Sequence, residues 1–321
     1  MWRPLIPALL MLAACGAHGP QLAAAMKPVT RHAQLRYEIR GKPFPLPLVS
    51  GRINGHPVMM LVDTGANSHV IAGWLARKLG LPMKKLGDVG TDHVGKPIAT
   101  YRIDKAEIVV DDWGKLGTTT VLATEVPDVI ERLGIGVFLS PQRLDEDGDA
   151  VMMDLAKGEL RAAIWEEAKE ELGDAGIALV TTADGHACEE NDGPVKGLAF
   201  VLPATIDSEV TNLLVDTGAQ HSDVFLTSPA GMKLAVRSSP NKEPMYTASG
   251  KVSVRKLRAA KIVSGAFAST ADIDLLAGAA DDSCPRDGVL AMDVLRTCRL
   301  LLGHGQILGR CAQPERATPT R

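Results

Sequence analysis

The feature that most constrains this chain is an internal repeat. Residues 51–66 read GRINGHPVMMLVDTGA and residues 204–219 read ATIDSEVTNLLVDTGA, and the two segments align without a gap. Each segment reads as a strand, a tight turn and a second strand, followed by the loop residues Asp-Thr-Gly. A repeat with so long a period is typical of two fused copies of one domain, because the units of a solenoid are much shorter.

The two copies also agree further along the chain. Polar, turn-rich stretches around Gly95 and Gly250 lie between apolar segments, and each copy ends in a hairpin-like segment. Short strands separated by Gly, Pro, Asn and Asp predict a mainly β fold, with two pseudo-symmetric β-barrel lobes and a few short helices. We expect six segments along the chain: a signal peptide (1–14), a tether (15–39), a first lobe (40–165), an acidic linker (166–194), a second lobe (195–313) and a tail (314–321).

The repeated loops carry the candidate catalytic groups. Asp63 and Asp216 each follow a strand of apolar residues, where a carboxylate is costly to bury unless it has a partner or a function. Approximate two-fold symmetry would bring the two loops together. The threonines could then hydrogen-bond across to the opposite loop, and the glycines would permit a tight turn and a close approach. These supporting residues are Thr64, Gly65, Thr217 and Gly218.

Paired carboxylates favour acid–base chemistry. Two carboxylates a few ångström apart cannot both ionise easily, so they would share one proton. One would act as general base on a water held between them, and the other as general acid toward a carbonyl. This chemistry needs no metal and no cofactor. A single Asp-Thr-Gly could be an ordinary turn, but two copies inside aligned flanks favour a dyad.

The segments Val62-Asp63-Thr64-Gly65-Ala66 and Val215-Asp216-Thr217-Gly218-Ala219 resemble the catalytic loops of retropepsin-like and pepsin-like aspartic proteases. The chain is most similar in organisation to bacterial retropepsin-like proteases that carry both lobes in one polypeptide. The resemblance covers most of the chain after residue 40, and it implies acid-protease lobes in which Asp63 and Asp216 are catalytic. It also implies β-hairpin flaps, near residues 88–98 and 244–253, that close over a peptide or protein substrate bound as an extended strand.

Two features depart from the pattern of that family. A glycine usually follows two apolar residues in the segment behind each catalytic loop, whereas Ser140 and Ala291 stand at the aligned positions here. Both are small, so the packing can survive. We therefore expect an aspartic endopeptidase, with an inactive peptide-binding scaffold of the same fold as the alternative. We interpret His69 and His221, which follow the two loops, as solvated loop residues; the alternative is that they tune the pKa of the dyad or the entry of substrate.

The N-terminus predicts export. Arg3 precedes a short apolar run that ends at Ala14 and is too short to cross a bilayer as a helix. Residues 12–15 read Leu-Ala-Ala-Cys and resemble a bacterial lipobox, which implies lipidation of Cys15; an ordinary secretory signal is the alternative. Gly16 is not the Asp of an inner-membrane retention signal, so we expect a lipoprotein on the periplasmic face of the outer membrane, attached by its lipid alone.

The other four cysteines predict two disulfides in an exported protein. Residues 298–311 read as a hairpin that turns at His304-Gly305. Cys298 and Cys311 would then face each other as a non-hydrogen-bonded pair, with Cα atoms about 4.5 Å apart, which is within disulfide reach. Elimination pairs Cys188 with Cys284. A metal site is the competing interpretation, but no metal-ligand spacing supports it.

The net charge and the composition exclude some classes of binding partner. The formal net charge is -3, and the sequence has no run of Lys and Arg interleaved with aromatics. This argues against nucleic acid or an anionic membrane surface as the main partner. We expect a monomer in which the two lobes form an internal pseudo-dimer.

Overall fold

The computed structural model describes residues 31–312 apart from 93–95, 118–119, 145–148, 174–177, 182–185, 191–196, 248–249 and 280–283. These residues belong to one unit that begins at Arg31. Cys15, the expected signal peptide and the expected tail lie outside the described residues. Within the part of the chain that is described, no helix is both long enough and apolar enough to cross a membrane.

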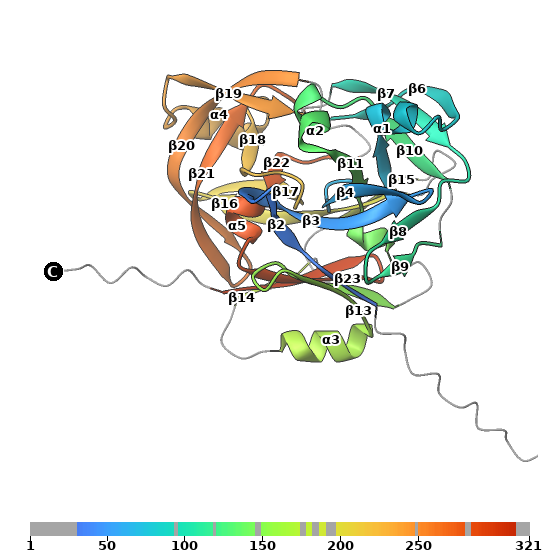
Figure 1. The fold of residues 1–321 in the computed structure, drawn as a ribbon. Coiled ribbons are helices and arrows are strands. Elements are labelled where there is room, and N and C mark those ends of the chain that lie inside the picture. The colour runs from blue at the N-terminus through green and yellow to red at the C-terminus, as the bar shows by residue number, and fades with distance from the viewer. Residues whose placement is uncertain are drawn as a thin grey trace, which may run out of the picture. The chain divides into compact units, whose positions relative to one another are not determined.

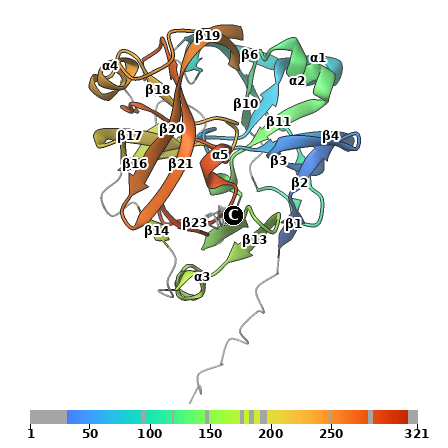
Figure 2. The ribbon, with the colours of Figure 1, turned by 90° about the vertical axis from the view of Figure 1, so that its left-hand side faces the viewer.

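Two large sheets form the two lobes, which stand side by side in Figures 1 and 2. The first lobe contains ten strands: β2 (Arg36–Ile39), β3 (Lys42–Ile53), β4 (His56–Val62), β5 (Val70–Ala72), β6 (Met83–Thr91), β7 (Pro97–Ile103), β8 (Ile108–Val110), β9 (Gly114–Lys115), β10 (Val121–Thr124) and β11 (Ile135–Leu139). Its helices are α1 (Gly73–Lys78), α2 (Asp128–Leu133) and the single-turn helix η1 (Pro141–Arg143).

The second lobe contains eight strands: β15 (His186–Glu190), β16 (Gly197–Ile206), β17 (Glu209–Val215), β18 (Asp223–Phe225), β19 (Lys242–Thr247), β20 (Gly250–Ser264), β21 (Phe267–Leu276) and β22 (Gly288–Leu290). Its helices are α4 (Pro229–Ala235) and α5 (Met292–Leu295). The mainly β, two-lobed architecture predicted from the repeat is confirmed.

The lobes repeat one pattern of strand pairing. In each, a hairpin (β3–β4 or β16–β17) leads to an Asp, and its second strand pairs in parallel with a strand from the end of the copy. The hairpin turns use left-handed backbone, with φ of 47° at Asn54 and 81° at Gly55, and 48° at Asp207 and 76° at Ser208. Asn, Asp and Gly adopt these angles most readily, which is why the turns were readable from the sequence.

A third sheet joins the lobes from below (Figure 1). It contains six strands in the order β1 (His32–Gln34), β13 (Glu159–Ala163), β12 (Ala150–Asp154), β23 (Cys298–Gly303), β24 (Gln306–Cys311) and β14 (Ala178–Thr181). The closing hairpins of the two copies meet at its centre, where β12 pairs with β23. The two lobes are therefore tied together by a continuous backbone ladder.

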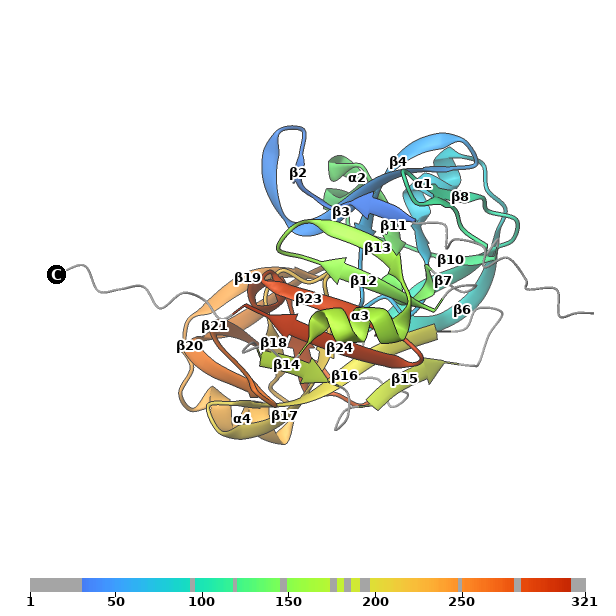
Figure 3. The same cartoon turned by 90° about the horizontal axis from the view of Figure 1, so that it is seen from below.

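Helix α3 (Trp165–Leu172) covers the outer face of this third sheet, as Figure 3 shows. Trp165, Ala168 and Leu172 repeat at helical spacing and pack against the sheet, while Glu166 and Glu167 are exposed. The segment 166–194, predicted as an acidic linker, thus contains most of α3 and then β14 and β15. The four acidic residues of α3 are exposed and form part of the solvent face of this amphipathic helix. The last residues of the expected tether, 32–39, likewise form strands β1 and β2.

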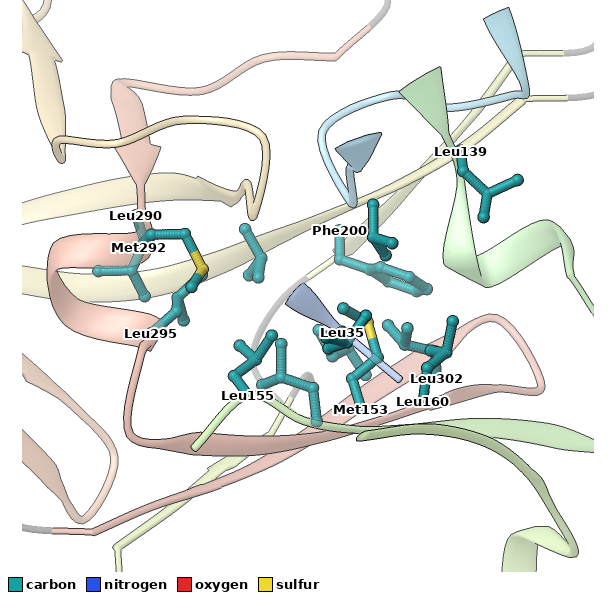
Figure 4. Packing of buried hydrophobic residues seen from close by; sticks show 14 of the residues in the cluster. Leu35, Leu139, Met153, Leu155, Leu160, Phe200, Leu290, Met292, Leu295 and Leu302 are labelled. Atoms are coloured by element: carbon teal, nitrogen blue, oxygen red, sulfur yellow. The ribbon is translucent and has the colours of Figure 1, made fainter. Parts of the chain in front are cut away.

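The main hydrophobic cluster draws on all three sheets. Figure 4 shows Phe200 of β16 in this cluster, together with Leu139 of β11 and Leu302 of β23. Side chains alternate across a strand, so Met153 faces this cluster whereas Met152 faces α3. Strand β12 is buried along its whole length because both of its faces are covered.

The C-terminal hairpin has the predicted register. It turns at His304 and Gly305, both with positive φ, and pairs Cys298 directly with Cys311. These two buried cysteines form a disulfide, as predicted. Cys284 is also disulfide-bonded. Its pairing with Cys188 stays a prediction, because the Cys188 side chain lies outside the described residues.

Replacing both Cys298 and Cys311 with Ala is expected to lower the free energy of unfolding by about 3 kcal/mol. The bridge spans a separation of 13 residues, and a cross-link of this loop length restricts the unfolded chain by about that amount. Urea unfolding of the oxidised proteins measures the difference. The same comparison under reducing conditions is the control, since a difference that persists there would reflect packing and not the cross-link.

Candidate active site

Asp63 and Asp216 occupy equivalent places in the two lobes. Asp63 follows β4, and its backbone N–H donates to the carbonyl of Leu139 on the parallel strand β11 at 2.9 Å. Asp216 follows β17, and its N–H donates to the carbonyl of Leu290 on β22 at 3.0 Å. Each carboxylate therefore stands at the end of a buried strand whose position is fixed by a parallel neighbour.

The loop after each Asp folds back on its carboxylate. Atom Oδ1 of Asp63 accepts hydrogen bonds from the N–H of Gly65 at 2.9 Å and of Ala66 at 3.0 Å. The Asp216 loop repeats this arrangement with its own Gly and Ala, at 2.7 and 3.0 Å. Because both donors bind the same oxygen, the second oxygen of each carboxylate is left for contact outside its own loop.

The two loops are cross-linked by Thr64 and Thr217, both fully buried. The hydroxyl of Thr64 donates to the carbonyl of Val215 at 2.7 Å and accepts from the N–H of Thr217 at 3.0 Å. The hydroxyl of Thr217 donates to the carbonyl of Val62 at 2.8 Å and accepts from the N–H of Thr64 at 3.1 Å. Four reciprocal hydrogen bonds thus hold the loops together in the lobe interface.

The glycine in each loop faces the carboxylate of the other. A Cβ atom on Gly65 would lie 2.5 Å from Cγ of Asp216, and one on Gly218 would lie 2.4 Å from Cγ of Asp63. No side chain fits at these distances. The glycines are therefore required because each loop approaches the carboxylate of the other lobe, whereas neither glycine has a positive φ that the turn would demand.

The carboxyls of Asp63 and Asp216 interact across the lobe interface, where each also lies against the glycine of the opposite loop. Burial raises the pKa of Asp63 well above its ordinary value, and the charge of the adjacent Asp216 and a hydrogen bond with its side chain raise it further. The N–H groups of Ala66 and Gly65 act in the opposite direction. The geometry is that of a carboxyl pair holding one proton between them.

The segments behind the loops contain the two departures from glycine. Ser140 and Ala291 follow the strand residues that pair with Val62 and Val215, so they are equivalent positions, and both are fully buried. The N–H of Ser140 donates to Nδ1 of His69 at 3.1 Å, and that of Ala291 donates to Oγ of Ser222 at 2.9 Å.

The prediction that His69 is solvated is wrong, since it is only 3% exposed; His221 is exposed, as expected.

Gln142 and Asp293 complete the supports, and sequence reasoning missed both. The amide of Gln142 donates to the carbonyls of Thr64 and Ala66 at 3.1 and 2.9 Å. The carboxylate of Asp293 accepts from the N–H and the hydroxyl of Ser222 at 3.0 and 2.7 Å. Each lies two residues after its small residue, Ser140 or Ala291, so extending the repeat alignment by two positions would have indicated them.

A buried acidic group distinguishes the second lobe. Asp223 and Asp274 are neighbours on β18 and β21, both about 2% exposed, and Asp274 pairs with Lys256 at 2.6 Å. Burial raises the pKa of Asp223 well above its ordinary value, and the charges of Asp216 and Asp274 raise it further. The equivalent position in the first copy is Val70, so this difference was visible in the sequence alignment but was not recognised.

The segments expected to be flaps are both hairpins. Strands β6 and β7 pair up to Thr91 and Pro97, and β19 and β20 pair up to Thr247 and Gly250. The hairpin tips at 93–95 and 248–249 lie outside the described residues. Tyr246, near the end of β19, is 67% exposed.

The sequence matches the aspartyl protease family over residues 49–136 and 202–294. These segments make up more than half of the chain, which therefore belongs to the aspartyl protease family. No curated protein matches it.

Among solved structures, the aspartic proteinase from Irpex lacteus is similar in fold, with a TM-score of 0.50 at 8% identity over 91% of this chain and 100% of that chain. Basic 7S globulin from soybean aligns with a TM-score of 0.47 at 8% identity, over 88% of this chain and 94% of that chain. At such low identity, the first of these likenesses concerns the fold alone.

Proposed function

We propose that the protein is an aspartic endopeptidase that hydrolyses peptide bonds with a water activated between Asp63 and Asp216. The observation that carries this proposal is the contact between two carboxyls from equivalent loops, each loop locked to the other by a buried threonine. Burial and the second carboxylate keep one proton on the pair at pH values where an isolated Asp would have lost it.

The reaction follows from this shared proton. The ionised carboxyl accepts a proton from the water as its oxygen attacks the carbonyl carbon, and the protonated carboxyl donates to the carbonyl oxygen. The resulting tetrahedral diol collapses when the carbon–nitrogen bond breaks and a proton passes to the leaving amine. The pair again holds one proton, and no covalent acyl-enzyme is formed.

The substrate would be a peptide in extended conformation. The two hairpins β6–β7 and β19–β20 occupy equivalent positions in the lobes, as expected of a pair of flaps. An extended peptide beneath them would offer its backbone N–H and C=O groups to the hairpin edges, and its side chains would alternate between the lobes. Tyr246, exposed near one hairpin end, is a candidate contact for such a side chain.

The alternative of an inactive scaffold gains no specific support. It was motivated by Ser140 and Ala291, which replace family glycines. Both side chains fit in fully buried positions, and the strand residue just before each, Leu139 or Leu290, still accepts the N–H of its catalytic Asp. The small substitutions therefore leave the backbone behind the dyad intact.

A trapping experiment tests the reaction type. The full chain is incubated with a peptide library at several pH values, with and without pepstatin, and with an added amine nucleophile. We expect cleavage that pepstatin inhibits, with the acyl half of each peptide released only as the free acid. Transfer of the acyl half to the added amine would reveal an acyl-enzyme and would contradict direct attack by water. The absence of cleavage at every pH would favour the scaffold.

A further inference from the structure

The two catalytic loops rest on chemically different supports. In the second lobe, the hydroxyl of Ser222 accepts the N–H of Ala291, and the same hydroxyl is held by Asp293. In the first lobe, the corresponding acceptor is the imidazole of His69, which accepts the N–H of Ser140 through Nδ1. His69 and Ser222 lie at the same offset, six residues after their catalytic Asp. One copy thus uses a titratable ring where the other uses a hydroxyl.

The segment that His69 holds is the one on which the first loop rests. Leu139, just before Ser140, accepts the N–H of Asp63. Gln142, two residues after Ser140, donates to the carbonyls of the catalytic loop and also to the carbonyl of Leu198 at 2.7 Å. A shift of residues 139–142 would therefore displace the backbone of Asp63, because Leu139 is hydrogen-bonded to it.

The support works only with a neutral ring. An imidazole nitrogen that accepts a hydrogen bond carries no proton, so the neutral ring of His69 bears its hydrogen on Nε2. If Nδ1 were protonated, the ring N–H and the N–H of Ser140 would be two donors facing each other with no acceptor between them. Both residues are buried. A buried donor left without an acceptor is costly, so the segment would have to move.

We propose that His69 is a positioning residue that holds the first catalytic loop only while its ring is neutral, so that acidification releases this loop. In the second lobe, burial raises the pKa of Asp293, which therefore also takes up a proton in acid, but the hydroxyl of Ser222 can still accept the N–H of Ala291. This inference deepens the proposed function, and its kinetic consequences rest on that function. Its structural consequence, the release of Ser140, does not.

The surroundings of His69 offer little to stabilise a positive ring. The strands that enclose it, β5, β10 and β11, carry no titratable side chain. The charged group that acts on it is Arg143 of η1. Burial lowers the pKa of His69 to about 4, and the charge of Arg143 lowers it further, while a backbone contact at Arg143 acts in the opposite direction.

The pH window follows from these values. The unfolded chain takes up a proton at His69 near 6.5 and the folded chain near 4. Between them the unfolded state binds more protons, so the contribution of His69 to stability falls as the pH drops through this window. Below about 4 the ring is charged in the folded state too, and the release of Ser140 is expected there.

Hydrogen exchange tests the release without any assay of activity. The amides of Ser140 and Ala291 are compared in one sample of the full chain as the pH is lowered. We expect the protection of Ser140 to fall relative to that of Ala291 by up to about tenfold per pH unit as the pH is lowered from about 6.5 to about 4, and to level off below about 4, because one proton is involved. Equal protection of the two amides across this range would overturn the proposal.

Two variants sharpen the test. In His69→Asn the amide oxygen can take the place of Nδ1 as acceptor but cannot titrate. In His69→Ser, the hydroxyl acceptor of the second lobe is placed at the same offset in the first, and Gln142 keeps its own hydrogen bonds. Either variant is expected to keep Ser140 protected at low pH, so the proposal can still be tested if one of them fails to fold. His56→Asn is the matched control, since His56 is exposed at the start of β4 and should leave the pH profile unchanged.

The kinetic measurement is the ratio of kcat in His69→Asn to kcat in the wild type. This ratio is expected to rise about tenfold for each pH unit below about 4, with KM much less affected. Coincident acid limbs of wild type and variant would refute the kinetic role. If Ser140 is released but no peptide is cleaved at any pH, the proposed function fails and the inference about His69 stands.

Discussion

Asp63→Asn and Asp216→Asn are each expected to reduce kcat by about 10²- to 10⁴-fold, with KM little changed. Each substitution keeps the size of the side chain but removes the group that shares the proton, and general acid–base catalysis by one positioned group contributes about this factor. The two carboxyls act as one unit, so the losses do not multiply, and the double variant is expected to be about as active as either single variant. Cleavage of the best peptide from the library measures all three.

The control for these variants is Asp128→Asn, an exposed Asp at the start of α2. It changes the net charge by the same amount and should cleave at the wild-type rate. Undiminished cleavage by either dyad variant would remove Asp63 and Asp216 from the mechanism. It would leave the family membership intact, because that rests on the sequence match and not on turnover.

Asp63→Asn also changes the dependence of stability on pH, with a definite sign. Burial and Asp216 raise the pKa of Asp63 in the folded state above 3.8. As the pH rises past this value, the folded state binds more protons than the unfolded state, so stability is lost. Asn at this position does not titrate. Asp63→Asn should therefore become more stable relative to the wild type as the pH is raised from about 4 to about 7.

The dyad could be predicted because the chain contains it twice. A single Asp-Thr-Gly has many explanations, but two aligned copies predict that equivalent loops meet on a pseudo-two-fold axis. The register of the disulfide hairpin was equally accessible, because the turn at His304-Gly305 fixes which residues oppose each other. Both predictions rest on geometry that is local or is dictated by symmetry.

The errors came from positions whose environment is set by distant segments. His69 follows Asn and Ser, a local sequence typical of a loop, yet residues 139–143 bury it. Beyond a helix that starts at Trp165, the acidic segment 166–194 is expected to be a linker, yet it contains β14 and β15, which pair with β24 and β16. Neither outcome follows from the local sequence, because both require knowledge of which strands pair across the lobes.

Thr64→Val and Thr217→Val are each expected to lower the free energy of unfolding by about 2–6 kcal/mol. Valine has nearly the shape of threonine, so the loss is that of the hydroxyl. Thr64→Val leaves the carbonyl of Val215 without its donor and the N–H of Thr217 without its acceptor, both in a fully buried site. Each buried group without a partner costs about 1–3 kcal/mol. Urea unfolding of the full chain measures the change.

Two controls separate the cross-lobe role from burial of a hydroxyl in general. Thr211 is also fully buried, but its hydroxyl donates only to the carbonyl of Ala204 within one hairpin. Thr211→Val should therefore cost about 1–3 kcal/mol. Thr64→Ser keeps the hydroxyl and loses one methyl group, at a cost of about 1 kcal/mol. If Thr64→Val is no more destabilising than Thr211→Val, the cross-lobe bonds do not contribute as argued.

The double variant Thr64→Val with Thr217→Val tests whether the interface acts as a unit. The four hydrogen bonds are distinct, so independent bonds would give additive losses. The two loops share one interface, however, and once the first hydroxyl is lost they can separate and let water reach the second pair. We therefore expect a loss smaller than the sum, with the lobes still joined by the β12–β23 ladder. Additive losses would mean that the loops stay in contact after the first hydroxyl is lost. The kcat of the double variant should then fall less than it would if the two carboxyls had lost their alignment.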